Sequence, residues 1–176
     1  MKQNQTIKKQ RKYASHWECG DKLQKEKGVA KDWLDQSDTY HNLVCMPDRN
    51  CAPDFTIQDA KNNLIALEIT ELVDEKAVGE NERDNRVYRD YVDKEEIECK
   101  LSKILCKKDQ KKYHNGPYKK IIILIHTDEP MIQYEYHNDV IKDMNFTNFK
   151  QINEAFLLFS YHPKNQSYPC IKLNIK

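Results

Sequence analysis

The chain has 176 residues, with 29 Lys or Arg against 28 Asp or Glu, so its formal net charge is +1. A balance this even excludes a whole-molecule field that draws the protein to nucleic acid or to a membrane, and any such binding must come from a local patch. Hydrophobic residues make up 39% of the chain and only four residues are glycine, which excludes collagen-like and Gly-rich linker sequences. A chain of this length can bury a sizeable core.

Targeting signals are not expected. The longest apolar run, Ile121 to Ile125, is far shorter than the roughly 20 residues that cross a bilayer. Residues 1–12 are polar and basic, so we expect no secretory signal and a cytoplasmic protein. This basic segment is interpreted as a flexible arm, with contact to phosphates as the functional alternative. No repeat or shift in composition divides residues 13–176, which we expect to form a single domain.

The chain has six cysteines, which in a cytoplasmic protein are expected to be reduced. Cys99 and Cys106 are seven residues apart in a helical pattern and are predicted to pack as small hydrophobic side chains. A zinc site is the alternative use of the other cysteines, because four members of one His and Cys set would close a tetrahedral structural site. The set is His16, Cys19, His41, Cys45 and Cys51.

The first half of the chain is expected to contain a helix and a hairpin. Apolar residues with helical spacing occur within residues 13–37, and residues 38–53 are rich in Pro, Asp, Asn and Cys, as in a loop. Polar and apolar residues alternate over residues 54–58. Residues 64–73 are rich in β-branched side chains and have the length of a strand. Turn-forming Asp, Lys and Asn residues join the two, which predicts a β-hairpin.

The second half alternates helices and strands. Helical spacing extends from Val87 to Tyr113, and Lys120–His126 is a near-continuous apolar run of the kind found in central strands. A helix is predicted over residues 137–152, a buried strand over Ala155–Tyr161 and an edge strand over Tyr168–Ile175. The order of elements predicts an α/β fold: a three-layer α/β/α sandwich around a mixed central sheet.

Two acidic residues in the predicted hairpin carry the functional hypothesis. Asp54 opens the first strand and Glu68 lies fourteen positions later inside the second, so adjacent antiparallel strands can place them side by side. Their carboxylates and the backbone carbonyl of Ile69 form an all-oxygen set suited to Mg²⁺ or Mn²⁺. A lone buried carboxylate is costly, so Glu68 within an apolar strand suggests a function. The alternative is a solvated or salt-bridged Glu68.

Pro53-Asp54, the hairpin, Glu68-Ile69-Thr70 and the following helix and strand together resemble the PD-(D/E)xK superfamily of nucleases. The similarity extends over residues 15–160 and implies a restriction-endonuclease-like fold. It also implies a metal-dependent phosphodiesterase in which the hairpin presents two acids and a lysine two positions further on assists the attacking water. The resemblance further implies DNA as the substrate, with RNA as the alternative, and a homodimer as one way to cut two strands.

Thr70 stands at the family's lysine position, and a threonine is neither a cation nor a useful base at neutral pH. Thr70 is therefore expected to position water or substrate. Lys100, Lys103 and Lys107, on the helix after the hairpin, are candidates to supply the missing cation, although their spacing is also that of a solvated helix face. Otherwise the site is inactive.

Three further residues are weaker candidates for this site. The family often adds an acid from its first helix, for which Glu26 is the better candidate and Glu18 the other, and each is alternatively a plain surface charge. His126, at the end of the central strand, is interpreted as structural.

Three functions remain open on the sequence alone. The first is a Mg²⁺- or Mn²⁺-dependent DNA nuclease in which Lys107, Lys108, Lys111 and Lys112 contact phosphates. The second is a non-catalytic descendant that binds nucleic acid or protein. The third is an interaction protein stabilised by zinc at the His and Cys set.

Overall fold

The computed structural model describes residues 21–46, 51–73, 93–129, 131–163 and 165–176. Its helices are α1 (Lys22–Leu34), α3 (Lys94–Asp109) and α4 (Tyr134–Lys142). Its strands are β1 (Tyr40–Cys45), β2 (Phe55–Asp59), β3 (Leu64–Glu71), β4 (Lys120–Thr127), β5 (Asn145–Phe146), β6 (Glu154–Phe159) and β7 (Cys170–Ile175). The basic segment of residues 1–12 and the predicted helical residues 87–92 lie outside the described ranges.

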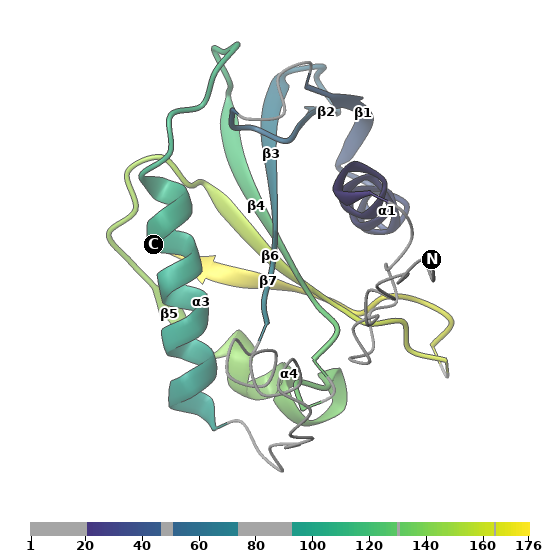
Figure 1. Cartoon of the computed structure of the whole chain (residues 1–176), viewed down its shortest axis with the longest axis vertical. Coiled ribbons are helices and arrows are strands. Elements are labelled where there is room, and N and C mark those ends of the chain that lie inside the picture. The colour runs from purple at the N-terminus through teal and green to yellow at the C-terminus, as the bar shows by residue number, and fades with distance from the viewer. Residues whose placement is uncertain (1–20, 47–50, 74–92, 130, 164) are drawn as a thin grey trace, which may run out of the picture.

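The seven strands form one mixed sheet in the order β1-β2-β3-β4-β6-β7-β5 (Figure 1). Strands β1, β2 and β3 pair antiparallel, whereas β3, β4 and β6 run parallel at the centre. Strand β7 is antiparallel to β6 and parallel to the short β5. The parallel strand β4 is apolar along most of its length because helices cover both of its faces, as its sequence predicts.

Two hydrophobic cores, one on each face of the sheet, build the three layers. Val29, Ala30 and Trp33 of α1 pack on one face, against alternate residues of β2, β3 and β4. Helices α3 and α4 cover the other face, where α3 contributes Leu101 and Leu105 (Figure 1). The predicted α/β fold with helices on both sides of a mixed sheet is therefore confirmed.

Local sequence explains the hairpin formed by β2 and β3. The Asp59 carboxylate accepts hydrogen bonds from the backbone N–H groups of Lys61 and Asn63, both at 2.9 Å. Asn62 adopts a positive φ of 60°, a conformation that asparagine tolerates better than most residues. Phe55 pairs with Leu67 in the resulting register, which brings the start of β2 beside the middle of β3.

Helix α3 is defined at both ends by side-chain chemistry. The Asp93 carboxylate caps its N-terminus by accepting a hydrogen bond of 2.7 Å from the N–H of Glu96. Lys107 and Lys108 lie in the last turn, where positive charge is favoured by the helix dipole. The helix therefore delivers lysines at its C-terminal end.

Three predicted elements differ in the structure. Residues 40–45 form the edge strand β1 instead of a loop; Tyr40 is its only buried residue, so it lacks an alternating apolar pattern. The helix predicted over residues 137–152 ends at Lys142, and Asn145–Phe146 pairs with β7 as β5. Strand β7 is consequently paired on both sides and is not an edge strand.

Cysteines of α3 do not pack as predicted. Cys99 and Cys106 are exposed, because Ile97, Leu101 and Leu105 form the buried stripe of this helix. None of the helices within the described ranges has the length and apolar character needed to cross a membrane.

Candidate functional site

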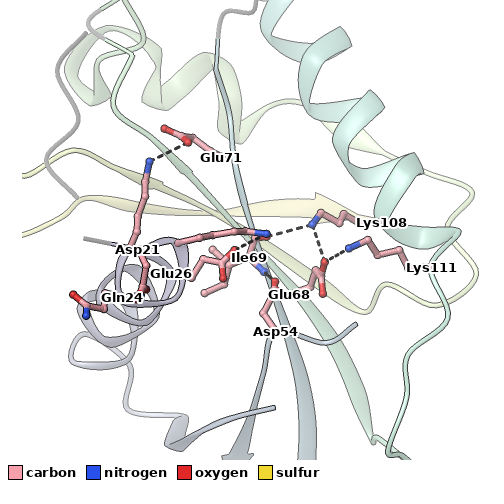
Figure 2. Close-up of polar contacts among 11 residues, drawn as sticks. Asp21, Gln24, Glu26, Asp54, Glu68, Ile69, Glu71, Lys108 and Lys111 are labelled. Carbon is pink, nitrogen blue, oxygen red and sulfur yellow. Dashed lines mark hydrogen bonds and ion pairs between the residues drawn. The ribbon is translucent and has the colours of Figure 1, made fainter. Parts of the chain in front are cut away.

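Asp54 and Glu68 lie together on the hairpin. Asp54 directly precedes β2, and the register of the hairpin sets it opposite Glu68. The Asp54 carboxylate accepts a hydrogen bond of 2.8 Å from the backbone N–H of Ile69 (Figure 2). Ile65, Leu67 and Ile69 face α1, so strand alternation directs Glu68 toward α3.

The two carboxylates influence each other. Burial raises the pKa of Asp54, and the negative charges of Glu68 and Glu26 raise it further. The hydrogen bond from Ile69 and the charge of Lys108 act in the opposite direction but do not outweigh them. Asp54 is therefore held close to other acids in a desolvated environment, the situation found at many functional sites.

Glu68 meets two lysines from the end of α3. Only 1% of its surface is exposed, and its Oε1 accepts hydrogen bonds from Lys108 Nζ at 2.8 Å and Lys111 Nζ at 2.5 Å (Figure 2). Lys108 Nζ also donates to the carbonyl oxygen of Ile69 at 3.2 Å. The second oxygen of Glu68, Oε2, is buried and accepts no hydrogen bond from any described residue.

The two lysines differ in their surroundings. Burial lowers the pKa of Lys108 despite its ion pair with Glu68. Burial also acts to lower the pKa of Lys111, but the hydrogen bond and charge of Glu68 outweigh it, so this pKa is raised. Lys108 has 12% of its side chain exposed and Lys111 has 40%. Lys111 is therefore the more accessible of two cations that share one carboxylate oxygen.

Contacts beyond α3 fix the position of these lysines. The Tyr113 hydroxyl donates to the carbonyl oxygen of Lys108 at 3.1 Å, and the N–H of His114 donates to that of Ala52 at 2.8 Å. The Asp109 carboxylate accepts hydrogen bonds from the N–H groups of residues 150–152. These contacts hold the end of α3 against the segment that carries Asp54 and against the start of β6.

The cations predicted from the sequence occupy other positions. Lys100 forms an ion pair with Glu96 at 3.1 Å, and Lys103 and Lys107 are exposed on α3. The lysines that contact Glu68 are Lys108 and Lys111, for which the sequence predicts contacts with phosphates. Thr70 is half-buried, and alternation places it on the same face of β3 as Glu68.

Glu26 is the acid that α1 brings closest to this site. Its exposed fraction is 6%, it forms an ion pair with Lys22 at 3.4 Å, and its charge raises the pKa of Asp54. Figure 2 shows it between α1 and Ile69. Glu18 lies outside the described residues.

His126 is buried at the end of β4. Burial and the charge of Lys25 lower its pKa to about 3, so its imidazole is neutral at physiological pH. Lys25 itself forms an ion pair with Glu71 at 3.0 Å. These interactions fit the predicted structural role of His126.

In the described part of the chain, no three His, Cys, Asp or Glu side chains are grouped so that they could hold a metal ion. Glu26 is therefore not gathered with Asp54 and Glu68 into a three-carboxylate group. His16 and Cys19 lie outside the described residues, and His41 and Cys45 are exposed on β1. Zinc binding by the His and Cys set stays a prediction.

A second polar cluster lies on the α1 face of the sheet. Glu154 accepts hydrogen bonds from Tyr40 at 3.1 Å, from Lys120 and from Lys172 at 2.9 Å. These residues line a pocket of about 530 Å³ that also includes Trp33 and Phe156. Neither Asp54 nor Glu68 lines this pocket, so the two acidic sites are separate.

Taken together, the fold and this site define an α/β protein whose central hairpin presents two acids to lysines from a covering helix. No protein-family model matches the chain, and comparison with curated proteins gave no match. Among solved structures, the chain is similar to SfsA from Pyrococcus furiosus, determined in complex with Ca²⁺, with a TM-score of 0.31 and 14% sequence identity. The match covers 87% of this chain, which spans 62% of the SfsA chain.

Proposed function

We propose that the protein is a Mg²⁺- or Mn²⁺-dependent phosphodiesterase of restriction-endonuclease-like fold that cuts DNA. The observation that supports this proposal most directly is the buried Oε2 of Glu68, which no described residue satisfies and which lies beside a second carboxylate. A buried carboxylate oxygen without a donor is costly, and a bound cation would compensate for that cost.

The residues present suit such a cation. Asp54, Glu68 and the carbonyl oxygen of Ile69 would be its ligands, and all three provide oxygen atoms, which Mg²⁺ and Mn²⁺ prefer. Mg²⁺ is commonly bound by one or two carboxylates and keeps several water molecules. Two carboxylates and one carbonyl are therefore sufficient, and Glu26 is not required as a direct ligand.

A cation in this set supplies polarisation of the phosphodiester and a lowered pKa of bound water. Lys111, with 40% of its side chain exposed, would donate hydrogen bonds to a phosphoryl oxygen while it stays next to Glu68. Thr70, on the same face of β3, would orient water or substrate through its hydroxyl. The cation that the family places at position 70 would thus come from the end of α3.

A nucleic acid is the proposed substrate because exposed lysines flank Lys108 and Lys111 in the sequence, and the resemblance to the nuclease superfamily favours DNA. Lys107 and Lys112 are exposed on either side of Lys108 and Lys111 and would contact phosphates, which supply most of the affinity of proteins for DNA. A local patch of this kind is required, because the net charge of the chain is only +1.

Nicking of supercoiled plasmid DNA in Mn²⁺ tests this proposal. We expect the wild type to nick and Glu68→Gln to lose at least 100-fold in rate, a loss typical for removal of a catalytic electrostatic group. Glu154→Gln is the matched control, since it changes a buried, lysine-paired glutamate away from this site and should retain the wild-type rate. Equal rates for all three proteins would contradict the proposal. A labelled RNA of the same sequence distinguishes the two nucleic acids.

The alternative function is a non-catalytic module that binds nucleic acid. Two observations favour it: Thr70 replaces the family's lysine, and Lys108 and Lys111 balance the charges of Asp54 and Glu68 without a metal ion. DNA binding that persists in EDTA and in Glu68→Gln, together with no nicking by the wild type, would support this alternative over the enzyme.

A further inference from the structure

We propose that the ammonium group of Lys108 holds the cation position of this site, so that a divalent metal ion binds only by displacing it. This inference rests on the proposed function, because it concerns the same ligand set. It assigns to Lys108 control over metal affinity, a role different from that of Lys111.

The contacts of Lys108 carry the inference. Its Nζ donates to Glu68 Oε1 at 2.8 Å and to the carbonyl oxygen of Ile69 at 3.2 Å, which are two of the three proposed metal ligands. The third ligand, the Asp54 carboxylate, accepts a hydrogen bond from the N–H of the same Ile69. Figure 2 shows Lys108 reaching from α3 to the point between Glu68 and Ile69.

Two cations cannot share this position. Mg²⁺ binds oxygen at about 2.0–2.1 Å, so an ion bound to the Glu68 carboxylate and to the Ile69 carbonyl oxygen, which Lys108 Nζ contacts at 3.2 Å, would lie close to the Lys108 ammonium. Like charges at such a distance repel strongly in a poorly solvated site. The ammonium therefore has to move before the ion binds, and removal of the ammonium raises affinity.

Lys111 provides an internal comparison. It donates to the same Oε1 of Glu68 but, unlike Lys108, forms no hydrogen bond with the carbonyl oxygen of Ile69, and its side chain is much more exposed. Lys111 can therefore neutralise the charge of Glu68 without filling the space between Glu68 and the Ile69 carbonyl oxygen. Loss of Lys111 therefore changes the charge near the site, whereas loss of Lys108 changes the charge and also vacates the position.

Calorimetric titration with Mn²⁺ separates these effects. We expect Lys108→Met to bind Mn²⁺ at least tenfold more tightly than the wild type, Lys111→Met to change affinity by less than threefold, and Lys172→Met, at the distant cluster, to match the wild type. Equal gains in Mn²⁺ affinity for Lys108→Met and Lys111→Met would mean that the loss of a positive charge near the site explains the effect, and would overturn the inference. Unchanged affinity in Lys108→Met would overturn it as well, while the proposed function would stand.

A measurement on the wild type tests the inference even if the Lys108→Met variant does not fold. Reductive methylation followed by mass spectrometry reports how accessible each lysine is, and we expect saturating Mn²⁺ to increase labelling of Lys108 several-fold relative to Lys172. Unchanged labelling in the presence of bound Mn²⁺ would refute displacement. An absence of Mn²⁺ binding in every variant would overturn this inference and the proposed metal-dependent function together.

Discussion

Two buried glutamates of this protein are each paired with two lysines but have different surroundings. Glu68, on the α3 face of the sheet, is paired with Lys108 and Lys111, and Glu154, on the α1 face, with Lys120 and Lys172. Both oxygens of Glu154 accept hydrogen bonds, with one donor at Oε2 and two at Oε1. The donors of Glu68 converge on one oxygen and leave the other without a partner among the described residues.

The neighbouring groups increase this difference. Glu154 has Tyr40 as a neutral donor, and its pKa is lowered because the hydrogen bonds and charges of its lysines outweigh burial. Glu68 has a second acid beside it, and burial together with the charge of Glu68 raises the pKa of Asp54. A lysine-paired glutamate with both oxygens satisfied is a structural group, whereas one with an open oxygen and a neighbouring acid fits a binding site.

The largest expected contrast is in the cost of removing each glutamate. Glu68→Ala leaves the largely buried ammonium of Lys108 without its paired carboxylate and should destabilise the fold by about 3 kcal/mol. Glu154→Ala should cost about 1 kcal/mol, because Lys172, with 61% of its side chain exposed, can be solvated by water. Urea unfolding of both variants measures the difference. Similar costs would mean that the two clusters are equivalent.

The pH dependence of stability should also differ at the Glu154 cluster. The pKa of Glu154 is lowered by folding, so its stabilising contribution is present above its unfolded pKa and is lost as the pH falls through its folded pKa. We expect the wild type to exceed Glu154→Gln by about 1 kcal/mol at pH 7 and by almost nothing once Glu154 is protonated in both states. A difference that stays constant from pH 7 to pH 3 would contradict this sign.

Asp54 should show the opposite sign. Its folded pKa is raised, so its ionised form opposes folding at neutral pH, and this cost disappears as the pH falls through the folded pKa and Asp54 becomes protonated. Asp54→Asn keeps an acceptor for the Ile69 N–H and should stabilise the fold by up to about 1 kcal/mol at pH 7, with a smaller gain in acid. The same variant should lose Mn²⁺ binding. Thermal unfolding across pH tests the stability change; destabilisation at pH 7 would show that Asp54 is a structural group.

The smallest effect is expected at Tyr40. Tyr40→Phe removes one donor from Glu154 Oε1, which keeps its ion pair with Lys120, so the cost should be about 0.5 kcal/mol. Mn²⁺ affinity should not change. Chemical denaturation and the Mn²⁺ titration together check this variant, and altered metal affinity would indicate that the two acidic clusters are coupled through the sheet.

Local sequence was sufficient to predict the hairpin and the proximity of its acids. The turn residues between Asp59 and Asn63 fix a short connection, and alternation along β3 fixes the face on which Glu68 lies. The apolar run of β4 likewise identified the central strand. These features depend on neighbours a few residues away, so a single sequence contains the information.

Strands that form only by pairing with another segment could not be predicted from local sequence patterns. Strand β1 has an exposed, weakly patterned sequence, and only its pairing with β2 makes it a strand. The two residues of β5 likewise owe their conformation to β7. The helix predicted across Asn145 and Phe146 was wrong for this reason, since tertiary pairing prevailed over local spacing.

The choice among the lysines of α3 shows the same limit. Helical spacing groups Lys100, Lys103 and Lys107 on one face but does not indicate how far the helix extends past Glu68 or how it is rotated. The contact with Glu68 falls instead to Lys108 and Lys111, at the end of the helix, because Asp109 and Tyr113 anchor that end.

Short-range periodicity and turn chemistry therefore specify the α/β class, the central hairpin and the two candidate acids, so one amino-acid sequence is enough to predict them. The packing of helices across the sheet specifies which cations contact Glu68, which of its oxygens has no donor and which second glutamate forms the comparable lysine-paired cluster. Those features depend on how a helix packs across a sheet, and a shift of one turn in that packing would exchange one lysine for another.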